Sequence, residues 1–214
     1  MNINNQLILM YMKQLLMIAA LMLLPLAAAA QDNTWEQPEK TATASNPDAK
    51  YLAGAVPEVD GRVIFSTTIK APGKSAKQIF DLLRKDMERI TKESNQFEQS
   101  RISLADSVKM QVAGSYQEWL VFKNKPLNLD RTRFFYTLIA DCRDGEATIQ
   151  LTRIHDLYDE ERLAMTYRAE EWINDRYGLN KKQTKLARVS GKFRRKTIDR
   201  KDYLFNRFTK LLEK

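Results

Sequence analysis

The stretch Gly61–Met87 reads GRVIFSTTIKAPGKSAKQIFDLLRKDM and carries the signals for a strand, a turn and a helix in direct succession. Apolar and polar side chains alternate over residues 62–70, which is typical of a strand with one buried face. Ser75 and Gln78 have the spacing of a capping box, which predicts a helix over residues 75–92. The apolar residues of this helix recur at helical spacing: Ala76, Ile79, Phe80, Leu83, Met87 and Ile90.

The chain beyond this helix has the pattern of an antiparallel sheet followed by helices. Short connections between consecutive strands require antiparallel neighbours. The resulting order, β-α-β-β-β-β-α, predicts an α+β fold in which helices pack on one face of a curved sheet. The runs 101–105 and 108–113 are either two strands or one strand that is interrupted at Asp106-Ser107. Strands are expected at 101–105, 108–113, 117–122, 132–140 and 147–155, and helices at 170–177 and 199–212.

The first 30 residues have the features of a cleaved signal peptide. Residues 15–26 read LLMIAALMLLPL, an apolar run that follows Lys13 and precedes the small residues Ala27–Ala30. A bilayer-spanning helix needs about 20 residues, so this run is too short to cross a membrane. The alternative is a retained N-terminal anchor, which Pro25 disfavours. We therefore expect an exported protein, periplasmic or extracellular, with no transmembrane span after signal cleavage.

The remaining chain is expected to hold one domain and a C-terminal extension. Residues 31–57 are polar with almost no apolar periodicity, which predicts a disordered linker. An α+β domain is expected over residues 58–158, and a helical, basic extension over residues 159–214. Cys142 is the single cysteine, so no internal disulfide can form and stability must come from packing.

Two stretches of this sequence resemble a known family. They are Gly61–Met87, quoted above, and residues 169–205, AEEWINDRYGLNKKQTKLARVSGKFRRKTIDRKDYLF. They are similar to the secreted Bacteroidetes domain of unknown function numbered 4468, and the likeness covers Val59–Asp156 together with the run Gly191–Asp199. The resemblance implies a fold like that of the TATA-box-binding protein and an exported location. It implies no catalytic residues.

The motifs that could indicate an enzyme are incomplete. Gly73-Lys74-Ser75 resembles the end of a phosphate-binding loop, but Thr68 stands where that loop requires glycine. His155 is the single histidine, so a zinc site lacks its usual partners. Cys142 lies in a predicted turn, without the oriented base that a nucleophile needs. We therefore expect no catalytic residue, no metal site and no cofactor.

Positive charge is concentrated at the C-terminal end of the chain. Residues 176–214 contain 14 Lys and Arg against three Asp and Glu, whereas the whole chain has a net charge of +8. Such a segment attracts anionic surfaces, and its aromatic residues add contact area. The alternative is a loop that folds back on the acidic part of the same domain. The residues expected to contact a partner are Lys192, Arg194, Arg195, Lys196 and Arg200.

These patterns favour a non-enzymatic binding or envelope-associated domain. The expected partners are anionic lipid head groups, an anionic glycan or an acidic protein. Genomic DNA is not expected, because minor-groove binding of the TATA-box type uses intercalating aromatic pairs and two pseudo-symmetric halves. The alternative function is a small apolar-ligand carrier, with a pocket between sheet and helices that is floored by Trp119, Phe134 and Tyr136.

Overall fold

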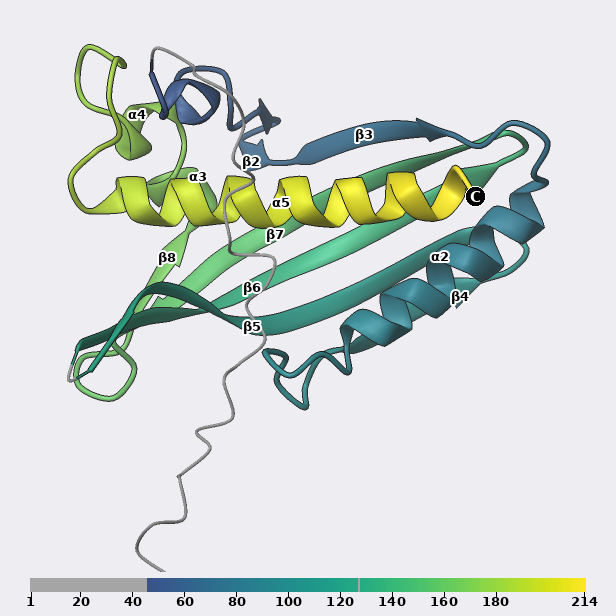
Figure 1. Ribbon diagram of the computed structural model, residues 1–214, viewed down its shortest axis with the longest axis horizontal. Coiled ribbons are helices and arrows are strands. Elements are labelled where there is room, and N and C mark those ends of the chain that lie inside the picture. The colour runs from purple at the N-terminus through teal and green to yellow at the C-terminus, as the bar shows by residue number, and fades with distance from the viewer. Residues whose placement is uncertain (1–45, 127) are drawn as a thin grey trace, which may run out of the picture. The chain divides into compact units, whose positions relative to one another are not determined.

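The computed structural model describes residues 46–126 and 128–214 of the chain (Figure 1). The predicted signal peptide and most of the predicted linker lie outside these residues. A two-stranded sheet, β1 (Glu58–Val59) and β2 (Arg62–Val63), precedes the main sheet. The strands of the main sheet are β3 (Phe65–Lys70), β4 (Arg101–Asp106), β5 (Gln111–Lys125), β6 (Asn128–Arg143), β7 (Glu146–Tyr158) and β8 (Met165–Arg168).

All strand pairs in the main sheet are antiparallel, and their order is β3-β7-β6-β5-β4. Strand β8 also pairs with β7, along the same edge that β3 uses. Strand β3 pairs with residues 146–151 of β7, and β8 pairs with residues 155–158. The edge of β7 is therefore shared by two strands, and residues 152–154 lie between them.

Two long helices cover one face of the sheet, and three shorter helical segments complete the described part of the fold (Figure 1). The final helix crosses the sheet in front, and α2 lies beside it. The elements are the 3-10 turn η2 (Ala49–Tyr51) and the helices α2 (Ala76–Ile90), α3 (Ala169–Trp172), α4 (Asp175–Gly178) and α5 (Ser190–Leu212). The predicted class, a curved antiparallel sheet with helices on one face, is confirmed.

Helix α2 begins where the sequence predicts. The Ser75 hydroxyl accepts a hydrogen bond from the Gln78 backbone N–H, and the Gln78 side chain accepts one from the Ser75 backbone N–H. This reciprocal cap satisfies two of the N–H groups that a helix start leaves unpaired. The predicted apolar face is buried, and Ile79, Leu83 and Ile90 have no exposed surface.

Several element boundaries differ from the prediction. Residues 111–113 and the predicted run 117–122 belong to one strand, β5, and residues 107–110 form the turn that joins β4 to β5. The helix predicted over 170–177 is two short helices, because Asn174 caps a new start at α4. Strand β8 was not predicted. Helix α5 begins at Ser190, nine residues before the predicted start.

The C-terminal segment shares the core of the α+β domain. Phe193, Leu204 and Phe208 of α5 belong to the same buried cluster as Phe65 of β3 and Leu83 of α2. The linker predicted up to residue 57 also ends earlier, because Tyr51 and Val56 are buried. The described residues therefore form one packed unit, without a separate extension after residue 158.

Candidate functional site

Arg194, one of the predicted contact residues, is fully buried at the start of α5. Its guanidinium donates hydrogen bonds to the carbonyls of Tyr51 (2.6 Å), Leu52 (2.7 Å) and Ile173 (2.7 Å). It also forms an ion pair with Asp175 at 2.7 Å. Arg194 thus joins α5 to the segments on either side of it, and its predicted exposure to a partner is wrong.

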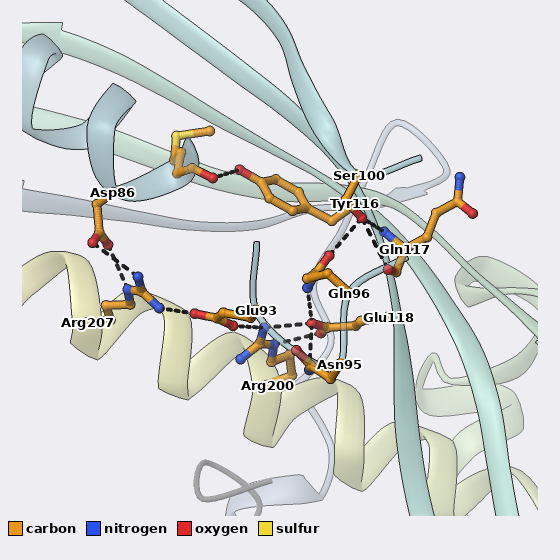
Figure 2. Close-up of polar contacts among 11 residues, drawn as sticks. Asp86, Glu93, Asn95, Gln96, Ser100, Tyr116, Gln117, Glu118, Arg200 and Arg207 are labelled. Atoms are coloured by element: carbon orange, nitrogen blue, oxygen red, sulfur yellow. Dashed lines mark hydrogen bonds and ion pairs between the residues drawn. The ribbon is translucent and has the colours of Figure 1, made fainter. Parts of the chain in front are cut away.

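Arg200, a second predicted contact residue, is in the middle of α5, and its side chain points toward Glu118 of the sheet (Figure 2). Its Nε and Nη2 atoms each donate to a carboxylate oxygen of Glu118 on β5, both at 2.6 Å, and neither side chain is exposed. The Glu118 carboxylate also accepts from the amides of Asn95 and Gln96. Burial works to lower the pKa of Arg200, but the Glu118 carboxylate outweighs it and raises that pKa above its usual value. Arg200 is therefore a charged structural residue, and its predicted exposure is wrong.

A second arginine extends this network along α5. Arg207 donates to both carboxylate oxygens of Asp86 on α2, at 2.7 and 3.1 Å, and also to Glu93 (Figure 2). Glu93 in turn accepts from Arg200 at 3.3 Å. Two arginines of α5 thus pair with three carboxylates contributed by β5, α2 and the loop after α2.

The other predicted contact residues also face the domain in part. Lys192 donates to Asp130 at 2.7 Å and to the Tyr158 hydroxyl at 3.0 Å. Arg195 donates to Asp48 at 2.6 Å. Lys196 is partly buried. The five residues therefore lie on one helix, α5. The contacts of Lys192, Arg194, Arg195 and Arg200 agree with the alternative reading of the sequence, in which the basic segment packs on acidic residues of its own domain.

One group of exposed basic residues lies in the loop between α4 and α5, which we call the basic loop (residues 179–189). Asn180 orders it: its backbone N–H donates to the Lys185 carbonyl, and its side-chain oxygen accepts from the Thr184 N–H, both at 2.9 Å. Four cationic side chains of the loop are exposed, and none has an ion pair among residues 46–126 and 128–214. They are Lys181, Lys182, Lys185 and Arg188.

A second candidate site is a cleft of about 240 Å³ on the edge of β7, which we call the β7 cleft. The cleft lies beside residues 152–154 of β7, between the part of this edge that pairs with β3 and the part that pairs with β8. Four of its seven lining residues are charged, and none of the predicted aromatic residues lines it, so it differs from the predicted apolar pocket. Its lining residues are Arg62, Thr152, Arg153, Ile154, His155, Arg168 and Glu170.

His155 in the β7 cleft is half-buried and stacks on Phe135, with the ring centroids 4.4 Å apart. Burial lowers the pKa of His155, and the nearby Arg168 lowers it further. A bond to the Arg153 carbonyl and the charge of Glu170 act in the opposite direction. The net effect is a pKa below the usual value of a histidine, which favours the neutral imidazole. The sequence singled out His155 alone, because Thr152, Arg153 and Ile154 beside it form no motif and the remaining cleft residues are distant from it in the chain.

Strand register separates the residues of the predicted apolar pocket. Phe134 pairs with Glu118, so its side chain lies on the helix-covered face together with that of Tyr136, and both are buried. Trp119 pairs with Arg133 and projects from the opposite face, because side chains alternate along a strand. The three aromatic residues therefore do not line one pocket.

Cys142 lies in strand β6 and is buried, not in the predicted loop. Burial raises the pKa of its thiol to about 12, and Asp141 contributes in the same direction. Ser75 is the cap of α2, as described above. In the part of the chain that the structure describes, no group of three or more His, Cys, Asp or Glu residues is placed to hold a metal ion.

Comparison with known proteins places the chain in a family. The family model described as a domain of unknown function (DUF4468) with TBP-like fold matches residues 65–156. A DUF4468 family protein from Bacteroides ovatus, solved by crystallography, is 42% identical; the match covers 78% of this chain and 95% of that one, with a TM-score of 0.73.

A more distant solved structure supports the fold alone. A TBP-like protein from Parabacteroides distasonis is 17% identical, with 73% of this chain and 96% of that chain covered and a TM-score of 0.57. No curated protein matches this sequence. The match to the Bacteroides ovatus protein, together with the family model over residues 65–156, establishes that this chain belongs to the DUF4468 family of domains of unknown function with a TBP-like fold.

Proposed function

We propose that this protein is an exported, non-enzymatic binding module that contacts an anionic partner through the basic loop. The observation that carries the proposal is the difference between the cations of α5 and those of the loop. Arg194 and Arg200 are occupied by internal carboxylates and carbonyls, whereas the four cations of the loop project into solvent without ion pairs among the described residues. The proposed contact surface therefore lies before α5, in the basic loop, and not at the predicted residues 192–200.

The loop has the charge and the order that an electrostatic contact needs. Each Lys or Arg close to an anionic surface contributes about 1 kcal/mol, and the attraction decays over a Debye length of ~8 Å at physiological salt. Because Asn180 holds the loop backbone in one arrangement, little conformational entropy is lost on binding. Genomic DNA is not proposed as a partner, because a TBP-like fold does not by itself assign DNA binding.

Export is the second part of the proposal, and its support comes from the sequence of residues 1–30. Ala28 and Ala30 occupy the positions that a signal peptidase selects, so the mature chain should begin at Gln31. N-terminal sequencing of the protein recovered from cells tests this directly. An uncleaved chain found in the membrane fraction would contradict it. Among the described residues, no helix is long and apolar enough to cross a membrane.

Neutralising the loop tests the binding surface. A variant with Lys181→Gln, Lys182→Gln, Lys185→Gln and Arg188→Gln should sediment less with vesicles that contain phosphatidylglycerol, and the loss should be large at low salt and small at high salt. The matched control removes four exposed lysines elsewhere, at positions 85, 109, 123 and 125. Equal loss in both variants would show that net charge, rather than the loop, determines binding.

Further partners are compared by the same measurement. An acidic polysaccharide in place of the vesicles tests the glycan partner, and a polyglutamate peptide tests the acidic-protein partner. Circular dichroism shows whether each variant is folded. If neither vesicles, polysaccharide nor peptide binds the parent protein more tightly than the loop variant, the proposal is wrong.

A further inference from the structure

The β7 cleft concentrates guanidinium groups that the domain itself does not neutralise. Arg62 and Arg153 have no ion pair among the residues that the structure describes, in contrast to the arginines of α5. Arg168 has two carboxylate neighbours, Glu170 and Glu171, but at 3.9 and 4.0 Å. Glu170 is the one carboxylate that lines the cleft, and the lowered pKa of His155 favours its neutral form. Three positive charges therefore face one negative charge.

The backbone of β7 is irregular at Arg153, one of the three arginines of the cleft. Strand β3 pairs as far as Leu151, β8 begins to pair at His155, and the register with β6 shifts between these points. Arg153 lies in this interval with φ of +54°, a conformation that non-glycine residues adopt at a cost. Irregularities of this kind redirect a side chain from the regular alternation of a strand.

We propose that the β7 cleft is a binding site for a phosphate monoester. A phosphate monoester carries a charge of about −1.5 to −2 at pH 7, which matches the excess of about two positive charges in the cleft. Guanidinium groups recognise phosphate oxygens through paired, charge-assisted hydrogen bonds. The volume of about 240 Å³ corresponds to roughly eight water molecules at ~30 Å³ each, which is enough for a phosphate and a small alcohol group.

Glu170 gives the site a preference among phosphates. Its Oε1 accepts a hydrogen bond from the Val63 backbone N–H at 2.8 Å, which fixes the carboxylate at the wall of the cleft. A fixed carboxylate repels a second anion and accepts hydrogen bonds from hydroxyl groups. A monophosphate of a sugar or polyol therefore fits better than inorganic phosphate or a diphosphate.

His155 provides a direct readout of binding, because it is the only histidine of the chain. The groups that face its ring are Phe135 from β6, the Arg153 carbonyl from β7, Arg168 from β8 and Glu170 from α3. A bound dianion favours the protonated imidazole, so glucose 6-phosphate should raise the pKa of His155 by about one for a charge within ~6 Å. The experiment is a pH titration of the His155 ring protons by NMR, with untagged protein at constant ionic strength.

Two variants and one control make the assignment specific. Arg62→Gln and Arg153→Gln should each weaken glucose 6-phosphate binding about tenfold to a hundredfold, the range for losing a charged hydrogen bond. Arg143→Gln is the matched control, since Arg143 is also exposed but is the last residue of β6, opposite Glu146 at the start of β7, and does not line the cleft. This variant should bind like the parent.

The source of the phosphate is tested by separate additions of glucose 6-phosphate, inorganic phosphate and phosphatidic acid vesicles. A response to vesicles but not to glucose 6-phosphate would assign the monoester to a lipid. No change in the His155 titration with any of them, or an equal change in the Arg62→Gln/Arg153→Gln double variant, would overturn the proposal. The basic-loop variant keeps all the residues of the cleft, so it should respond like the parent, and the two proposals succeed or fail separately.

Discussion

Arg200 on helix α5 and Glu118 on strand β5 form an ion pair with two hydrogen bonds of 2.6 Å, and neither side chain has exposed surface. The pair joins residues 82 positions apart in the sequence. The amides of Asn95 and Gln96 satisfy further lone pairs of the carboxylate. Helix α5, which carries eight Lys and Arg residues, is therefore fixed to the sheet by one of its own charges.

Removing one partner of this pair should be strongly destabilising. Arg200→Met leaves the Glu118 carboxylate buried without a counter-charge, which costs about 3–5 kcal/mol in unfolding free energy. Replacing both partners, by Arg200→Met with Glu118→Leu, should recover much of that loss, because no uncompensated charge remains. Urea denaturation of both variants measures the difference.

The exposed pair Lys77–Asp81 on α2 is the matched control. Lys77→Met should cost less than about 1 kcal/mol, since exposed ion pairs contribute little. A double variant at Arg200 and Glu118 that is less stable than the Arg200→Met variant would show that the buried charge is not the source of the loss.

Arg194 should be essential for the position of the segment that begins at Asn46. Arg194→Gln removes the donors to the carbonyls of Tyr51, Leu52 and Ile173, and each buried carbonyl left unpaired costs about 1–3 kcal/mol. We expect a lower melting temperature and faster hydrogen exchange around η2. Arg195→Gln, which breaks one partly exposed pair with Asp48, is the control and should have a small effect. Similar melting temperatures for the two variants would contradict this role of Arg194.

Asp156 should make the stability of the domain depend on pH. Its side chain is buried, and its Oδ1 has no hydrogen-bond partner within the described part of the chain. Burial raises the pKa of Asp156 to about 8, although a hydrogen bond with Thr132 acts to lower it. In the unfolded chain an Asp titrates near pH 4. Between about pH 4 and pH 8 the folded state therefore holds a proton that the unfolded state has lost, and the free energy of unfolding falls as the pH rises.

Asp156→Asn removes this titration and keeps a neutral side chain of the same shape. The variant should gain stability relative to the parent as the pH is raised from 4 to 8, in proportion to about 1.4 kcal/mol for each pKa unit of difference between the two states. Urea denaturation at several pH values measures it. Asp60→Asn, at an exposed turn, serves as the control and should follow the pH profile of the parent. Parallel profiles for parent and Asp156→Asn would show that Asp156 is ionised in the folded state.

The features that the sequence predicted well are those that depend on near neighbours in the chain. The capping box of Ser75 and Gln78 lies within one helical turn, and the apolar face of α2 needs only the helical period. The alternation in β3 is likewise local. Such signals identified α2, β3 and the fold class before any tertiary contact was known.

The features that were missed depend on distant partners. A run such as Lys192–Lys196 has the composition of a solvated loop, and only Asp130, Asp175 and other carboxylates far along the chain make it the buried start of a helix. The β7 cleft is a stronger case, because Arg62, just before β3, and Arg168, at the end of β8, line one cleft only when both strands pair with the same edge of β7. The local sequence around each residue does not indicate that the two line the same cleft.

Cys142 should be unreactive while the protein is folded. It is buried in β6 opposite Ala147 of β7, and burial raises the pKa of its thiol to about 12. Because the thiolate is the reactive form, alkylation by iodoacetamide at pH 8 should be far slower than for an exposed cysteine, whose pKa is about 8.5. Mass spectrometry of the intact protein follows the reaction, and addition of 6 M guanidinium chloride, a denaturing level, should allow full labelling.

The labelling rate also reports local opening of the sheet, since Cys142 lies in strand β6, which pairs on both edges. If the rate increases with urea in parallel with global unfolding, β6 opens only when the whole domain unfolds. The Arg200→Met variant should label faster than the parent because its global stability is lower, and Lys77→Met should label at the parental rate. Rapid labelling of the parent in buffer alone would show that the end of β6 is accessible, and would contradict the buried position of the thiol.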